Sequence, residues 1–216
     1  ALSAKVMKSI IDNNPNKIES LSDENKDTII SKTIEATTKQ AENDFDDEDL
    51  DLSKIVSKIV MSSNEDTATK VLETLNDQAK KSDSNVSLKV FVNLANEKNF
   101  EDKLNDISKQ SLISENIVEE MIEKSIDDIK DDNDLTLIKD IVKDSGEFLI
   151  KKIIDIDKKS NNNQLKIDQI IDEIIKEDPI KVIEIIDEEK EIIKEPIKPK
   201  KIEKIKDIID TNITPN

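Results

Sequence analysis

The sequence predicts an all-α protein in which antiparallel helical hairpins stack as a degenerate α-solenoid; a compact multi-helix bundle is the alternative. Apolar residues recur at i, i+3, i+4 and i+7 along most of the 216 residues, which places them on one face of a helix. One turn pattern also recurs between these stripes. The chain has a single glycine, which disfavours β-hairpins because their tight turns need residues with positive φ.

The clearest hairpin spans residues 165–193. The apolar stripe of its first helix is Ile167, Ile170, Ile171, Ile174 and Ile175. The residue before a proline disfavours the α conformation, so this helix should end near Lys176 or Glu177. Asp178 can serve as N-cap and Pro179 fits the first position of a second helix, because no N–H is needed there. The apolar stripe of that second helix is Val182, Ile183 and Ile186.

The same turn pattern is found around residues 10–18, 59–71, 141–153 and 174–186. An apolar pair is followed, four residues after its second member, by Pro15, Asn64, Gly146 or Pro179, and a second apolar series then begins. The intervals between these copies are uneven. The pattern therefore predicts degenerate stacked helix pairs, in which each pair buries its apolar face against its neighbours.

Further helices are expected from their apolar stripes, and a threonine-rich one is expected at about 23–39. Their ranges are 2–12, 52–60, 68–75, 86–96, 100–107, 114–130, 135–142 and 149–154. Ser114 is the expected N-cap of the 114–130 helix. The aromatic side chains on these stripes are expected in the core, namely Phe91, Phe100 and Phe148.

Four regions are predicted along the chain. Residues 1–41 form N-terminal helices, and 42–51 form an acidic linker, because seven of its ten residues are acidic and repel one another. Residues 52–194 form the helical-hairpin repeat domain. Residues 195–216 form a Pro/Lys-rich tail that ends in an amphipathic helix.

Composition restricts the chemistry that this chain can perform. It has no His, Cys, Trp, Tyr or Arg, so the usual transition-metal ligand sets and nucleophile pairs cannot be built. The single glycine excludes Gly-rich phosphate loops. We therefore expect no enzyme activity and no cofactor. A net charge of −17 argues against nucleic acid as a partner, and no apolar run is long enough for membrane insertion.

The acidic linker contains weak candidates for a metal site, because Ca²⁺ accepts carboxylates at flexible spacing. It lacks the glycine and the closing glutamate of an EF-hand loop, so a solvated linker is the favoured interpretation. The candidate ligands are Asp44, Asp46, Asp47, Glu48, Asp49 and Asp51.

A second acidic cluster lies at residues 127–128 and 131–132, where a helix is expected to end. Carboxylates are unfavourable at a helix C-terminus, so this cluster should be either solvated or neutralised by a lysine. Nearly all other acids fall on polar helix faces. Ion pairs between residues four apart are expected for Glu120–Lys124 and Asp172–Lys176.

The tail carries a basic cluster in an otherwise acidic chain, formed by Lys198, Lys200, Lys201, Lys204 and Lys206. It is interpreted either as a docking segment for an acidic surface of this chain or of another copy, or as part of a helix that caps the last hairpin. If Ala1 follows a cleaved signal peptide, an extracellular or cell-surface location is expected; otherwise the location stays open.

The sequence as a whole predicts a non-catalytic helical-repeat scaffold, a subunit of a larger assembly such as a filament or surface structure. Its partners would be proteins, including copies of itself. One alternative is a monomeric adaptor that binds proteins or peptides. Another is an enzyme that uses carboxylates and a divalent cation.

Overall fold

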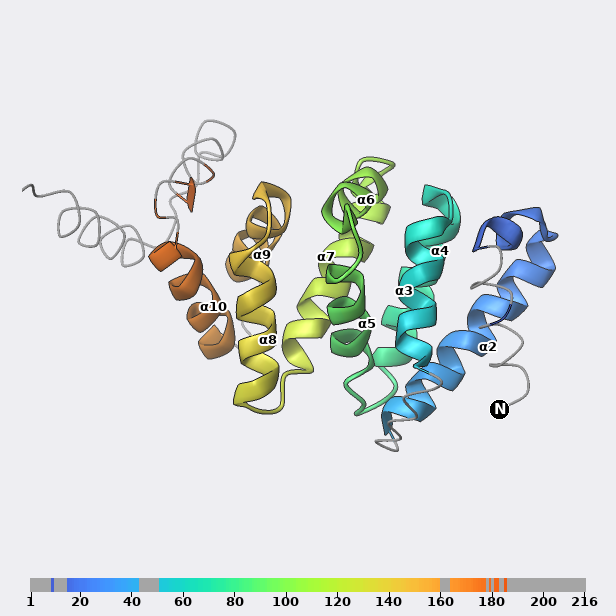
Figure 1. Ribbon diagram of the computed structural model, residues 1–216, viewed down its shortest axis with the longest axis horizontal. Helices are drawn as coiled ribbons and strands as arrows, with labels where there is room; N and C mark the ends of the chain where they lie inside the picture. Colours follow the sequence, from blue (N-terminus) through green and yellow to red (C-terminus); the bar gives the residue numbers. More distant parts are fainter. Residues whose placement is uncertain are drawn as a thin grey trace, which may run out of the picture. The chain divides into compact units, whose positions relative to one another are not determined.

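The computed structural model describes residues 9, 15–42, 51–159, 164–177, 179, 181, 182 and 185 (Figure 1). Over these residues the regular structure consists of nine packed α-helices and one 3₁₀ helix, with no strand. The predicted all-α class is therefore confirmed. The expected helix at 2–12 lies almost entirely outside the described residues.

The helices follow the predicted stripes closely. Their bounds are η1 Pro15–Ser20, α2 Asp23–Glu42, α3 Leu52–Ser62, α4 Glu65–Ala79, α5 Val86–Ala95, α6 Phe100–Ser108, α7 Leu112–Asp127, α8 Asp132–Lys143, α9 Glu147–Lys159 and α10 Gln164–Glu177. The chain divides into two compact units, unit 1 (Ala1–Asp131) and unit 2 (Asp132–Asn216). This boundary falls inside the range 52–194, and the predicted division into four regions stays a prediction.

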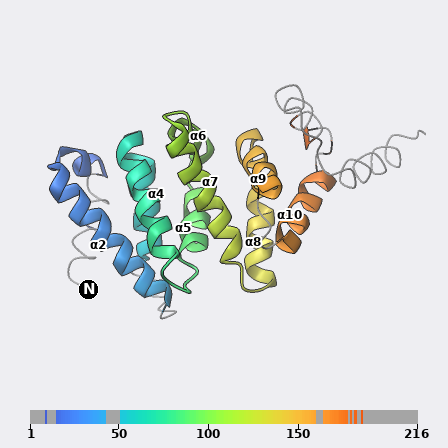
Figure 2. The same cartoon turned by 180° about the vertical axis from the view of Figure 1, so that it is seen from behind.

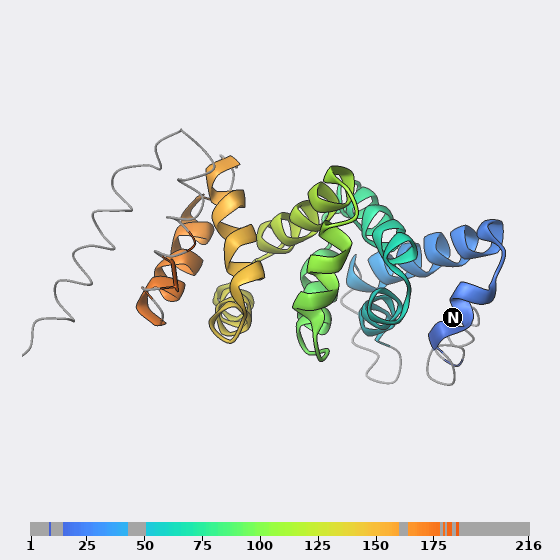
Figure 3. The ribbon, with the colours of Figure 1, turned by 90° about the horizontal axis from the view of Figure 1, so that it is seen from above.

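In unit 1 the helices form two layers (Figures 2 and 3). Helix α3 packs against α5 in one layer, and α2, α4 and α7 lie side by side in the other. Contacts between α3 and α4 and between α5 and α7 join the two layers, and α6 packs mainly against α7. Successive helix pairs of unit 1 are therefore neighbours in space.

The core of unit 1 consists of the predicted stripes. The buried residues on α3 and α4 include Ile55, Val56, Ile59, Val60, Ala68, Val71, Leu72 and Leu75. Phe91 is 1% exposed, as expected. Phe100 and Phe148 are only half-buried, because Phe100 begins α6 and Phe148 lies in the first turn of α9. The prediction that all three belong to the core is correct only for Phe91.

Helix α2 buries threonines on the same face as Ile30 and Ile34. The Thr37 hydroxyl donates to the Thr33 carbonyl at 2.8 Å, and the Thr38 hydroxyl donates to the Ile34 carbonyl at 3.0 Å. Bonding to the preceding turn satisfies hydroxyls that would otherwise be costly to bury. A threonine-rich helix can therefore pack in the core, and it extends to Glu42, three residues beyond the predicted end.

Side-chain hydrogen bonds tie each helix pair of unit 1 to the next. The buried Ser57 hydroxyl on α3 donates to the Val90 carbonyl on α5 at 3.0 Å, across 33 residues. The buried Asn76 amide on α4 donates to the Ile117 carbonyl on α7 at 3.0 Å, across 41 residues. Lys103 on α6 donates to the Ser63 carbonyl between α3 and α4, across 40 residues. These bonds connect positions about one helix pair apart in both layers.

In unit 2, α10 packs against both α8 and α9, most extensively against α8. All five predicted stripe residues of α10 are buried, and the helix is described as far as Glu177. Pro179 is helical. Val182 is buried as expected, and Ile185, which the prediction left out, is buried as well. Asp178, Ile183 and Ile186 lie outside the described residues.

The start of α7 differs from the prediction. Ser111, and not Ser114, is the N-cap, because its hydroxyl accepts the Ser114 backbone N–H at 3.1 Å. Ser114 lies inside the first turn and is buried. The earlier start adds Leu112 and Ile113 to the helix, where they are 72% and 70% exposed. An exposed apolar pair thus begins α7.

The Ser111→Ala substitution should lower the free energy of unfolding by about 1 kcal/mol, the usual effect of losing an N-cap side chain. Ser114→Ala should cost about half as much or less, because it removes only the contact between the two hydroxyls, 3.0 Å apart. Urea unfolding followed by circular dichroism measures both. An equal or larger loss for Ser114→Ala would contradict the assignment of Ser111 as the cap.

Candidate interaction site

Ion pairs connect the helices of the α2/α4/α7 layer. Lys80 on α4 pairs with Glu120 on α7 at 2.6 Å, and Lys70 on α4 pairs with Asp27 on α2. The hydrogen bond with Glu120 raises the pKa of Lys80.

The predicted pair Glu120–Lys124 is therefore wrong, since Lys124 pairs with Asp127 at 3.2 Å. The predicted partner of Lys176, Asp172, is likewise replaced by Glu173 at 3.4 Å.

A groove of about 220 Å³ lies between α4 and α7 in unit 1. Helix α4 lines it with Glu73, Asn76, Asp77 and Lys80, and α7 lines it with Ile113, Asn116, Ile117 and Glu120. The lining combines three carboxylates, two amides and two isoleucines with one lysine. The lysine already pairs with Glu120, so the rim of the groove is acidic.

Asn76 is the buried polar group of the groove, 1% exposed. Its amide nitrogen donates to the Ile117 carbonyl at 3.0 Å, while its Oδ1 has no hydrogen-bond partner in the structure. The orientation of the amide is fixed, because turning it over would set two oxygens against each other. The groove therefore contains an unused hydrogen-bond acceptor beside its carboxylates.

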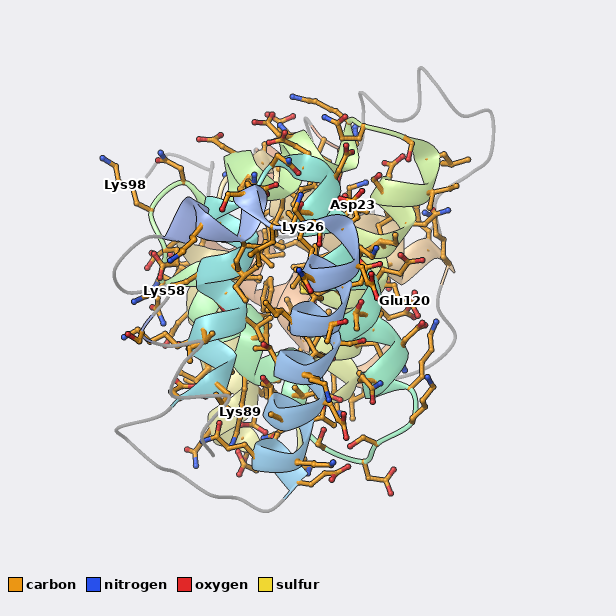
Figure 4. All side chains as sticks on the ribbon, turned by 90° about the vertical axis from the view of Figure 1, so that its right-hand side faces the viewer. Asp23, Lys26, Lys58, Lys89, Lys98 and Glu120 are labelled. Atoms are coloured by element: carbon orange, nitrogen blue, oxygen red, sulfur yellow. The ribbon has the colours of Figure 1, made fainter. Side chains whose placement is uncertain are left out.

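Charge is distributed unequally between the two layers of unit 1. Helix α3 carries two lysines and α5 carries one, with no acidic residue on either. Helix α4 carries four acidic residues and one lysine, and α7 carries five acidic residues and one lysine. In Figure 4, Lys58, Lys89 and Lys98 lie along one side, and Glu120 lies on the opposite side. Unit 1 thus presents a basic and an acidic face.

Two carboxylates cap helices to which they do not belong. Glu19 in η1 accepts the backbone N–H of Asn64 at 2.9 Å and the Thr67 hydroxyl at 3.2 Å, at the start of α4. Burial alone would raise the pKa of Glu19, but these donors and Lys26 together lower it. This role could not be predicted from local sequence, because Asn64 and Thr67 lie 45 and 48 residues away.

Asp128, which follows α7, caps the start of α5. Its Oδ2 accepts the backbone N–H groups of Ser87 at 3.0 Å and Leu88 at 3.3 Å. Burial raises the pKa of Asp128 to about 6, and the two N–H donors offset only part of that effect. The acidic cluster was expected to be solvated or neutralised by lysine. Asp127 is neutralised by a lysine as expected, since it pairs with Lys124. The expectation is wrong for Asp128, which is half-buried and accepts backbone N–H groups.

The structure describes one of the six candidate metal ligands. The carboxylate of Asp51 is the N-cap of α3 and accepts the Lys54 backbone N–H at 3.1 Å. The other five candidates lie outside the described residues, and so do the five lysines of the tail. The groove between α4 and α7 was missed by the sequence analysis, since it depends on which helices are neighbours.

Within the described ranges, no group of three or more acidic side chains is placed to hold a metal ion. None of the helices described is both long and apolar enough to cross a membrane. Comparison of this chain with protein-family models, with curated proteins and with solved structures finds no match.

Proposed function

We propose that this protein is a non-catalytic scaffold, a subunit of a larger assembly whose copies associate through surfaces of opposite charge. The charge segregation in unit 1 is the observation that carries this proposal. An acidic α4/α7 face and a basic α3/α5 face on one molecule are complementary between copies. Contact between unlike faces is heterologous, and such contacts build rings or open filaments.

The proposed architecture of unit 1 is a degenerate α-solenoid. The two-layer packing supports it, and so do the hydrogen bonds that join positions 33 to 48 residues apart along both layers. In a solenoid each helix pair contacts only its neighbours, which leaves long faces open to partners. Such a fold supplies surface for assembly.

The use of the acidic side chains supports a structural role. Asp128 has a strongly raised pKa and is half-buried, which are properties shared by catalytic acids. Its carboxylate, however, accepts N–H groups that begin another helix. Glu19 and Asp51 serve helix starts in the same way. These acids hold helices in place.

A monomeric adaptor is the second candidate, and the α4/α7 groove favours it. A groove with an acidic rim and an unused acceptor at Asn76 suits a peptide that carries cationic side chains. Both candidates use the same surface. They differ in whether the partner is another copy of this chain.

Sedimentation velocity separates the two candidates. If the protein assembles, the average mass of the sedimenting species should rise with protein concentration. It should fall as NaCl increases from about 0.1 M to about 1 M, because the screening length then drops from about 10 Å to about 3 Å. A chain that stays monomeric at every concentration would contradict assembly and favour the adaptor. Association that is insensitive to salt would contradict the role of charge.

A further inference from the structure

We propose that the groove between α4 and α7 is the receptor for the lysine-rich segment 198–206 of a second copy of this chain. The inference rests on the proposed association of copies through opposite charges, and it assigns the tail, in place of the α3/α5 face, as the basic partner of the α4/α7 groove. The segment contains five lysines and one glutamate within nine residues of a chain whose net charge is −17.

The groove has more hydrogen-bond acceptors than donors, because three of its eight lining side chains are carboxylates. Glu73 and Asp77 are exposed carboxylates on α4, and the buried Oδ1 of Asn76 has no partner in the structure. The one cation of the groove, Lys80, is held by Glu120 at 2.6 Å. A groove lined by an excess of carboxylates attracts an ammonium or guanidinium group. Since the chain has no arginine, its own source of such groups is lysine.

The apolar part of the groove suits the stem of a lysine. Ile113 forms one wall and is 70% exposed, and Leu112 beside it is 72% exposed. A lysine side chain covers apolar surface with its methylene groups while its charge reaches polar partners. At about 220 Å³ the groove is smaller than pockets for drug-sized ligands, so it accommodates individual side chains.

The segment fits the groove better than the basic α3/α5 face does. That face presents lysines from a packed helix layer, and Lys58 and Lys89 already interact within their own chain. A layer of helices cannot enter a groove of this size. A single segment with five lysines can insert individual side chains.

The test measures binding of a fluorescein-labelled peptide of residues 195–210 to the full chain. In this receptor chain the five tail lysines are changed to glutamine, so that its own tail does not compete with the peptide. Fluorescence anisotropy should show saturable binding. The added double substitution Glu73→Gln/Asp77→Asn should weaken the affinity about ten-fold. Both positions are exposed, so the fold should be retained, and circular dichroism checks this.

A matched control is Asp102→Asn/Asp106→Asn on α6, which removes the same charge from exposed positions outside the groove. It should leave the affinity within about two-fold of that of the parent chain. Equal losses for the two double variants, or no saturable binding, would overturn the inference. Weaker binding by Ile113→Ala would support the apolar wall.

Sedimentation distinguishes failure of this inference from failure of the proposed function. In the native background, Glu73→Gln/Asp77→Asn and the five-lysine variant should both reduce the mass of the assembly. Lys54→Gln/Lys58→Gln/Lys89→Gln on the α3/α5 layer should reduce it less. If the parent assembles and the α3/α5 variant alone prevents this, the inference is overturned while the proposed function stands. A parent chain that never assembles contradicts the proposed function.

Discussion

Replacing Asp128 by alanine is expected to lower the free energy of unfolding by about 2 kcal/mol at pH 5, because two buried N–H groups lose their acceptor. Ser87 and Leu88 are 0% and 3% exposed in the folded chain. The N-cap residue of α5 itself, Asn85, makes no side-chain hydrogen bond to the helix. Asp128 therefore supplies the cap from a different helix pair.

The effect of Asp128 depends on pH in a defined direction. Burial raises its pKa in the folded state to about 6, above the ordinary value of 3.8, so the folded chain holds a proton that the unfolded chain releases. The contribution of Asp128 to stability is then highest below pH 4. It falls as the pH rises through 6, by at most about 3 kcal/mol. Asp128→Asn keeps an acceptor oxygen and cannot ionise.

These properties separate the two Asp128 variants. At pH 8, Asp128→Asn should be at least as stable as the parent, while Asp128→Ala should be less stable than Asp128→Asn at both pH 5 and pH 8. Urea unfolding followed by circular dichroism at the two pH values provides the comparison. Asp106→Ala, on the exposed face of α6, is the control and should change stability by less than about 0.5 kcal/mol. Equal losses for the two Asp128 variants would refute the capping role.

Much of the local structure could be predicted because it depends on neighbours in sequence. The stripe from Ile55 to Val60 and the return stripe from Ala68 to Leu75 follow helical periodicity, and both are buried. Asn64 marks the turn between them, and its side chain accepts the Thr67 backbone N–H at 2.9 Å. A cap acts within three residues, so sequence spacing contains the needed information.

The groove and the capping carboxylates could not be predicted, because their partners are distant in sequence. Glu120 has a lysine four residues later, yet it pairs with Lys80, 40 positions earlier. Asp128 follows a helix of ordinary pattern, and nothing local indicates the start of α5 as its partner. Ile113 lies four residues before the buried Ile117 and is still 70% exposed, since burial depends on the extent of neighbouring helices.

Removing the Glu19 side chain should lower the free energy of unfolding by about 2 kcal/mol at pH 7, because its carboxylate accepts several hydrogen bonds at the start of α4. Both the backbone N–H and the side-chain amide of Asn64 donate to it at 2.9 Å. The Thr67 hydroxyl donates at 3.2 Å, and Lys26 pairs with it at 3.4 Å. Glu19→Ala tests the whole set, and Glu19→Gln tests the charge alone. Glu24→Gln, at an exposed position of α2, is the control.

The pH dependence of Glu19 should be opposite to that of Asp128, although both carboxylates cap a helix of another pair. Burial is the largest single influence on the pKa of both carboxyl groups, and by itself it would raise each pKa. At Asp128 two N–H donors are too few to overcome it. At Glu19 the N–H of Asn64, the hydroxyl of Thr67 and the ammonium of Lys26 together exceed it, and the pKa is lowered.

A lowered pKa means that Glu19 stabilises the fold at a pH above its ordinary value of 4.5, and that this contribution is lost as the pH falls through the folded-state pKa. The difference in unfolding free energy between the parent and Glu19→Gln should therefore be present at pH 7 and shrink below about pH 4. For Asp128→Asn the change is the reverse, with a gain that builds up between about pH 4 and about pH 6 and stays constant at higher pH. A difference for Glu19→Gln that stays constant from pH 7 to pH 3 would contradict this account. It would mean that hydrogen-bond geometry alone, without the charge of the carboxylate, secures the start of α4.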